Sequence, residues 1–89
     1  MTTTLLGGEL PVQVQGGAAA RTLPVALTVF ARRGAGTWET ALGRTLLPAG
    51  TDATTLTIPA DVGPELLVRA RPVTTRGEEV RGSIAVTHR

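Results

Sequence analysis

The chain contains no cysteine, lysine, asparagine or tyrosine, and its only histidine, His88, is the penultimate residue. Without cysteine there is no disulfide and no thiolate ligand, and one histidine is too few for a zinc site. Nucleophilic catalysis needs a base beside the nucleophile, and chain ends are usually mobile. We therefore expect no catalytic residue, no metal site and no cofactor, and predict that the protein is not an enzyme.

Carboxylates and glycines offer no replacement for the missing groups. The seven acidic residues are scattered over predicted loops and exposed strand positions, without the spacing of a metal-binding loop. No predicted helix follows the glycine pairs, and a phosphate-binding loop would also need a lysine. We interpret the carboxylates as solvated surface charge.

Aromatic residues are almost absent, since Phe30 and Trp38 are the only two. Hydrophobic residues still make up 42% of the chain, so the core must be built from small aliphatic side chains. A chain of 89 residues forms one domain, because it buries only about 60% of its unfolded surface. Stability should be modest unless neighbouring chains contribute.

The net charge of +2 is small, and the high isoelectric point arises because every basic residue is arginine. This balance does not predict a nucleic-acid partner. No apolar run approaches the ~20 residues of a membrane span, so we expect no membrane association by that means. The first eight residues lack the basic region and apolar core of a signal peptide, which predicts synthesis in the cytoplasm without secretion by that route.

Alternating hydrophobicity predicts β-strands. In the segment from Leu66 to Arg71, every second residue is apolar and the others are mostly arginine. The segment from Leu23 to Arg33 has the same period. The inward positions are Leu66, Val68 and Ala70 in the first segment and Val25, Leu27, Val29 and Ala31 in the second. A third alternating segment begins at Glu9, and Pro11 restricts it to a sheet edge or to the first residues of its strand.

Glycine and proline clusters divide the rest of the chain into further short strands. The predicted elements are a loop at Ala18–Arg21, a glycine-containing connection to a hairpin partner at Thr37–Leu42, an adjoining strand at Gly43–Leu47, and strands at Thr54–Pro59, Leu66–Val73 and Val80–Thr87. The last three should form a sheet. Six or seven strands predict an all-β, antiparallel β-sandwich that occupies residues 9–89 as a single domain. Residues 1–8 are expected to be a flexible N-terminal arm or a short edge strand.

Several of these segments resemble the fibronectin type III family, an immunoglobulin-like β-sandwich, in the divergent form found in bacteriophage tail and virion proteins. The resemblance covers roughly Val25 to His88. It rests on Gly36-Thr37-Trp38, on Thr54-Thr55-Leu56-Thr57-Ile58-Pro59, on Leu66-Leu67-Val68-Arg69-Ala70, and on the loop Thr74-Thr75-Arg76-Gly77-Glu78. In that loop, Arg-Gly-Glu is also an ordinary polar turn and indicates no binding function.

The resemblance implies a non-enzymatic structural or assembly module that acts through protein–protein contacts. We expect a small virion component, in the tail, the head–tail connection or the capsid decoration. Its partners would be other virion or assembly subunits, with the chain itself a homo-oligomer or bound to a lattice. Its location would be the virion.

In a type III arrangement, the strand from Leu23 to Arg33 lies beside the strand from Leu66 to Val73. One outer sheet surface would then carry Phe30, Arg32, Arg69 and Arg71, beside Thr28. Aromatic and arginine side chains are enriched at interface centres, so we predict a protein interface there. The alternative is that the N-terminal arm or arginine stems cover Phe30. The arm residues Thr2, Leu5 and Leu6 could add a strand to a neighbouring sheet.

Other partners for this surface are less well supported. Arginine with an aromatic ring can hold nucleic acid, but Glu39, Glu78 and Glu79 dilute the positive field. The alternative function from another class is an accessory module that binds a glycan or a cell-surface polymer. Its ligand platform would be Trp38.

Overall fold

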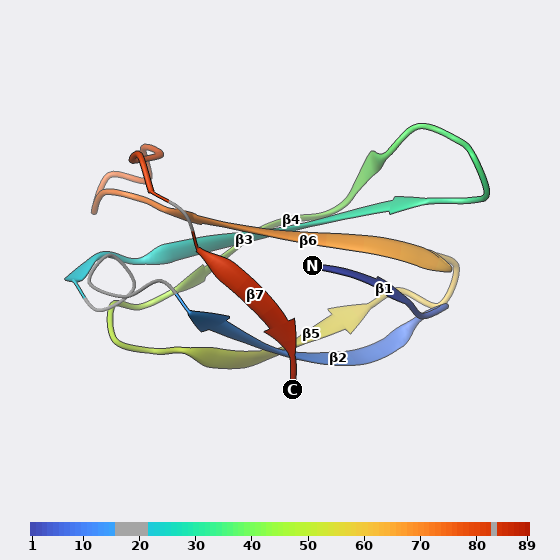
Figure 1. Ribbon diagram of the computed structural model, residues 1–89, viewed down its shortest axis with the longest axis horizontal. Coiled ribbons are helices and arrows are strands. Elements are labelled where there is room, and N and C mark those ends of the chain that lie inside the picture. The colour runs from blue at the N-terminus through green and yellow to red at the C-terminus, as the bar shows by residue number, and fades with distance from the viewer. Residues whose placement is uncertain (16–21, 83) are drawn as a thin grey trace.

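The computed structural model describes residues 1–15, 22–82 and 84–89, whose elements are seven β-strands in two antiparallel sheets (Figure 1). The four-stranded sheet has the order β1 (Thr2–Thr4), β6 (Glu65–Pro72), β3 (Val25–Arg32), β4 (Glu39–Leu47). The three-stranded sheet has the order β5 (Ala53–Ile58), β2 (Gly8–Gln15), β7 (Ala85–His88). The predicted all-β, antiparallel sandwich is confirmed.

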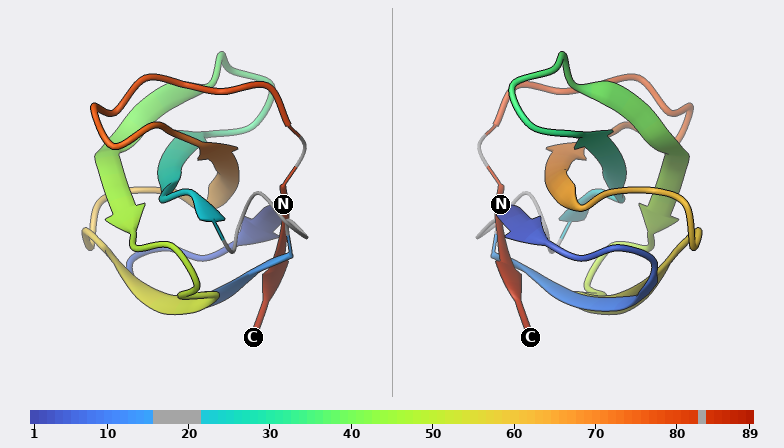
Figure 2. Two further views of the ribbon diagram at one scale, coloured as in Figure 1. Left: turned by 90° about the vertical axis from the view of Figure 1, so that its left-hand side faces the viewer. Right: turned by 90° about the vertical axis from the view of Figure 1, so that its right-hand side faces the viewer.

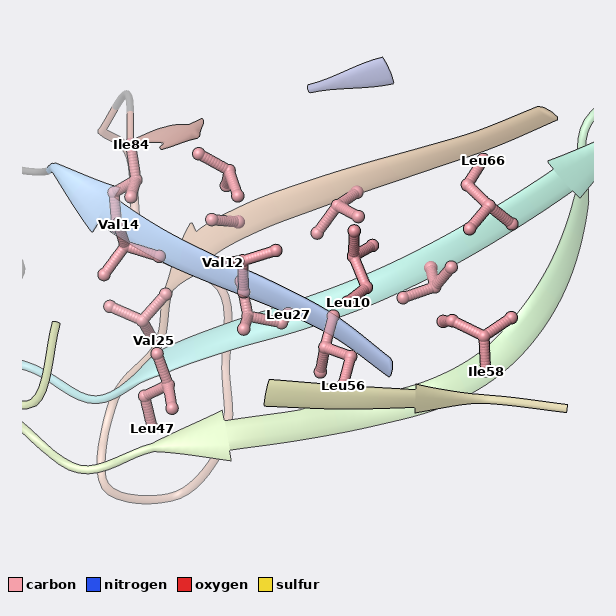
Figure 3. Packing of buried hydrophobic residues seen from close by; sticks show 14 residues of the cluster. Leu10, Val12, Val14, Val25, Leu27, Leu47, Leu56, Ile58, Leu66 and Ile84 are labelled. Carbon is pink, nitrogen blue, oxygen red and sulfur yellow. The ribbon is translucent and has the colours of Figure 1, made fainter. Parts of the chain in front are cut away.

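The two sheets enclose one aliphatic core. Viewed end-on, β4 and β5 lie along one side of the molecule and β1 and β7 along the other (Figure 2). Side chains from both sheets meet between them (Figure 3). The buried cluster consists of Leu10, Val12, Val14, Val25, Leu27, Val29, Leu47, Leu56, Ile58, Leu66, Val68, Ala70, Ile84 and Val86. Among the described residues, no polar or charged side chain is buried.

The alternation predicted for β3 and β6 is confirmed. The strands pair over eight residues, from Val25 opposite Pro72 to Arg32 opposite Glu65, and Val29 lies opposite Val68. Residues directly opposite each other share a face of the sheet. This register therefore puts Val25, Leu27, Val29, Leu66, Val68 and Ala70 inward and the arginines of both strands outward.

The prediction that the last third forms one sheet is wrong. β6 pairs with β1 and β3, whereas β5 and β7 flank β2 in the other sheet. The alternation within a strand specifies which side chains point inward. It does not specify which sheet the strand joins, because each sheet contributes one inner face to the sandwich.

The predicted strands Thr37–Leu42 and Gly43–Leu47 form one strand, β4, which begins at Glu39. Its register against β3 shifts at two places, between Leu27 and Val29 and between Val29 and Phe30. Such bulges insert extra residues into one strand without ending it. The two halves of β4 therefore differ in register against β3. The shift interrupts the alternation of side chains, and for this reason the sequence pattern predicts two strands instead of one.

Pro11 lies in the middle of β2, the central strand of its sheet, which contradicts the prediction of an edge or first position. The backbone bond from Arg89 N to Pro11 O shows that the backbone of Pro11 faces the β7 side. β7 ends at His88, one residue short of the position opposite Pro11. The missing N–H therefore points toward the end of the pairing with β7, and the hydrogen bonds between β2 and β5 do not need it.

The C-terminal strand is shorter than predicted. β7 covers only Ala85–His88, while Ile84 forms an isolated bridge with Ala70 and Val80 is half-buried outside the strands. The loop predicted at Ala18–Arg21 lies outside the described residues.

The first eight residues are built into the sandwich. Thr2–Thr4 pair with β6, Leu5 N donates to Pro64 O at 2.7 Å, and Gly7 N donates to Val62 O at 3.2 Å. A Cβ on Gly63 would lie 2.2 Å from Leu5 O, so only glycine permits this close crossing. The segment is a short edge strand and a linker into β2, and β1 is used within its own sheet.

Replacement of Leu66 tests the core. Its side chain is 0% exposed, so Leu66→Ala should lower the free energy of unfolding by about 2–5 kcal/mol through lost burial and a residual cavity. Urea denaturation followed by circular dichroism measures the change. Leu46→Ala is the matched control, because Leu46 is 55% exposed and should change stability by less than about 0.5 kcal/mol. Equal effects of the two substitutions would contradict this description of the core.

Candidate functional site

Both aromatic side chains lie outside the core, where they contact arginines of the outer face of the four-stranded sheet. Phe30 and Arg32 alternate with the inward residues of β3, and Arg69 and Arg71 do so in β6. We call this surface the outer face. It comprises Phe30, Arg32, Trp38, Arg44, Leu46, Glu65, Leu67, Arg69 and Arg71.

The first cluster on the outer face is centred on Arg32. Its Nε donates to Oε2 of Glu65, which lies directly opposite in β6. Its guanidinium carbon lies 4.3 Å from the centroid of the Trp38 ring. One guanidinium therefore holds a carboxylate and an aromatic ring together across the sheet. Because the Arg32 and Glu65 side chains are more than a third exposed, we expect about 1 kcal/mol or less from each contact.

The second cluster is centred on Arg69. Its guanidinium carbon lies 5.4 Å from the Phe30 ring centroid, and its Nη2 is 3.5 Å from Oε1 of Glu79. Phe30 lies between Thr40 of β4 and Leu67 of β6 in the sheet register. Phe30 is half-buried, and the Arg69 guanidinium lies over its ring.

Two outer-face residues are available for further contacts. Leu46 is 55% exposed, one of two large hydrophobic residues so exposed in the described part of the chain. Arg71 is exposed and, among the described residues, has no ion-pair partner. The outer face thus combines apolar surface with an arginine whose charge is not neutralised locally.

A structured turn borders one end of the outer face. The hydroxyl of Thr74 accepts hydrogen bonds from the backbone N–H groups of Arg76 and Glu78, both at 3.2 Å. Arg44 of β4 donates from Nη2 to the Gly77 carbonyl at 2.8 Å. The Arg-Gly-Glu segment is therefore held as a polar turn, and its neighbour Glu79 reaches Arg69.

The solvent-exposed surface of the three-stranded sheet, on the opposite side of the sandwich, is chemically different from the outer face. Alternation against the buried residues leaves these side chains outward: Glu9, Pro11, Gln13 and Gln15 of β2, Ala53, Thr55 and Thr57 of β5, and Ala85 and Thr87 of β7. The outward side chains of these described strands include no aromatic ring and no arginine. The concentration of both residue types on the other sheet distinguishes the two faces.

The predicted arm residues do not form a free arm. Thr2 lies opposite Leu67 on the outer face, and Leu5 is partly buried against the core. Leu6 is 58% exposed in the link between β1 and β2. A strand donated to another molecule by Thr2–Leu6 would first have to break the bonds that this segment makes within its own chain.

Features of other kinds of site are sparse. In the described residues, no three His, Cys, Asp or Glu side chains are grouped to hold a metal ion, and no helix is long and apolar enough to cross a membrane. His88 is exposed at the end of β7. An open hollow of about 310 Å³ lies beside Trp38, lined by Thr2–Thr4, Arg32, Glu65 and Leu66.

No protein-family model, no curated protein and no solved structure matches this chain. Sequence reasoning brought together Phe30, Arg32, Arg69 and Arg71, but missed both carboxylate partners. The alternation of β6 could have placed Glu65 on the face of Arg69. Glu79 could not have been found in that way, because it reaches the sheet from a loop.

Trp38 reports on the first cluster because it is the only tryptophan. Arg32→Ala should change the intensity and maximum of Trp38 emission in the folded protein, since the guanidinium over the ring is lost. Trp38→Ala should cost about 1–2 kcal/mol of unfolding free energy, less than the ~3–5 kcal/mol of a buried aromatic. Arg33→Ala is the control, because Arg33 has no ring contact. Emission unchanged by Arg32→Ala would exclude the stacked arrangement in solution.

Proposed function

We propose that the protein is a non-enzymatic structural subunit that assembles through the outer face of its four-stranded sheet. The observation that carries this proposal is the position of Phe30 and Trp38. A small domain with only two aromatic residues gains most stability by burying them, yet both lie outside the core against arginines. Aromatic and arginine side chains dominate the energetics of protein interfaces.

The charge of the outer face indicates the partner's chemistry. Arg32, Arg44, Arg69 and Arg71 outnumber Glu65 and Glu79, so two copies of this face would repel each other. A different subunit with carboxylates around an apolar centre would complement it. Leu46 and Phe30 would contact the apolar centre, and Arg71 would pair with a carboxylate.

We further propose that the sandwich is of the fibronectin type III kind and that the protein is a component of a virion. If β2, β3, β5 and β6 are equated with strands B, C, E and F of an immunoglobulin-like sandwich, the pairings B–E and C–F are those of the family. The terminal strands differ: β1 lies beside β6, where the family has its last strand, and β7 lies beside β2, where it has its first. With the resemblance to fibronectin type III modules of phage virions, this favours a tail, connector or capsid-decoration subunit.

A photo-crosslinking residue placed at position 46 tests the interface in the cells that produce the protein. It should join the chain to a partner with a surface rich in carboxylates, and the same residue at position 87 on the opposite outer face should not. Loss of a central contact of about 2 kcal/mol weakens binding about 30-fold, so Phe30→Asp and Arg71→Glu should abolish the crosslink.

Matched substitutions control for charge. Thr87→Asp introduces the charge of Phe30→Asp, and Arg89→Glu makes the reversal of Arg71→Glu, both away from the outer face. Circular dichroism confirms that each variant is folded. Equal crosslinking from positions 46 and 87, or crosslinking that survives both outer-face variants, would overturn the proposal.

The alternative function, binding of a glycan or surface polymer, is favoured by one observation. The hollow beside Trp38 is lined by the polar residues Thr2–Thr4 and by the charged residues Arg32 and Glu65, although Arg32 covers one face of the ring. If this function is correct, calorimetry should detect binding of a soluble cell-surface polysaccharide that is lost in Trp38→Ala. Leu46→Ala should leave that binding unchanged, whereas it should weaken the protein interface.

A further inference from the structure

The sheets formed by the described strands have four outermost strands, β1, β4, β5 and β7, and three of these carry features that prevent pairing with another chain. β1 has three residues and β7 has four. β4 has nine, but contains charged Glu39 and Arg44, and its register against β3 shifts twice. Short length, charge and bulges are the usual means by which edge strands avoid pairing. Of these four strands, only β5 is neither short, nor charged, nor distorted by a bulge.

β5 is a regular six-residue strand, Ala53–Ile58, without proline, glycine or charge. Its register against β2 is continuous over six residue pairs, so the edge is not distorted by a bulge. Asp52 precedes it and Pro59 follows it, which confines the regular edge to the strand itself. Threonine has a high strand propensity and occupies three of the six positions.

The backbone of β5 exposes pairing groups on its free side. Val14 N donates to Asp52 O, which shows that Asp52 and each second residue after it face β2. The backbones of Ala53, Thr55 and Thr57 therefore point away from β2. The side chains of Thr55 and Thr57 are exposed on the outer face of the three-stranded sheet.

We propose that β5 pairs antiparallel with β5 of a second copy of this chain, joining two three-stranded sheets into one. In the symmetric register, Thr55 lies opposite Thr55 of the second copy, and Ala53 opposite Thr57 of the second copy. A two-fold axis requires that when residue i of one copy lies opposite residue j of the other, residue j of the first also lies opposite residue i of the second. A charged strand would repel itself there, whereas the neutral β5 does not, and threonine pairs across strands are favourable.

This contact is distinct from the outer face, because β5 belongs to the other sheet. One pair of short strands buries less than the ~1,200 Å² of a standard interface, so the isolated dimer should be weak. It would gain strength when the partner subunit of the proposed assembly holds two copies close together.

Charge pairing at the two-fold axis tests the proposal. Sedimentation velocity of the wild type should show a monomer–dimer equilibrium that shifts with concentration. Thr55→Lys and Thr55→Glu should each be monomeric, since each places like charges opposite each other. An equimolar mixture of the two should recover the dimer. Thr55 is exposed, so both variants should fold, which circular dichroism verifies.

Thr87→Lys and Thr87→Glu are the matched controls on β7, and both should dimerise like the wild type. Hydrogen exchange gives an independent measurement: amide protection at Thr55 and Thr57 should rise with protein concentration. A wild type that stays monomeric at its highest soluble concentration would overturn the proposal, as would a mixture no more associated than its components. The outer-face variants Phe30→Asp and Arg71→Glu should retain this dimer, so either proposal can fail without the other.

Discussion

The antiparallel pairing of β3 with β6 is the interaction on which the rest of the structure depends. Its eight continuous residue pairs align the inward aliphatic residues of both strands and bring Arg32 opposite Glu65. Because side chains alternate between faces, a slip of one residue would turn the core side chains outward and the arginines inward. The same register therefore determines the core and the composition of the outer face.

The core is built only from aliphatic side chains, and the two aromatic residues lie outside it. It consists of Leu, Val, Ile and Ala, with no buried polar side chain among the described residues. Apolar burial and dispersion contacts stabilise it, and side chains of this size bury less area than aromatic ones. Phe30 and Trp38 contribute instead to contacts on the surface, where arginines partly cover them. We expect a domain with this distribution to have modest stability by itself and to gain more when another chain covers its aromatic surface.

The outer face and the free edge of β5 belong to different sheets, so their occupants need not compete. The outer face is positively charged and partly apolar, which suits a different, acidic partner. The β5 edge is neutral and regular, which suits a second copy. Together, the two proposed contacts would let one subunit bind a larger assembly and pair with a neighbouring copy on it.

The sequence by itself determined the strand faces, because alternation in segments such as Leu66–Arg71 follows directly from the pleat of a strand. It also placed Phe30 with Arg32, and Arg69 with Arg71, on the outward sides of their two strands, whereas only the resemblance to a type III arrangement suggested that the two strands are neighbours. Only the tertiary structure decided which sheet each strand joins, why Pro11 is accepted in a central strand, and that Glu79 reaches Arg69 from a loop. These features depend on pairing between distant segments, and the local pattern of a strand contains no information about its partner.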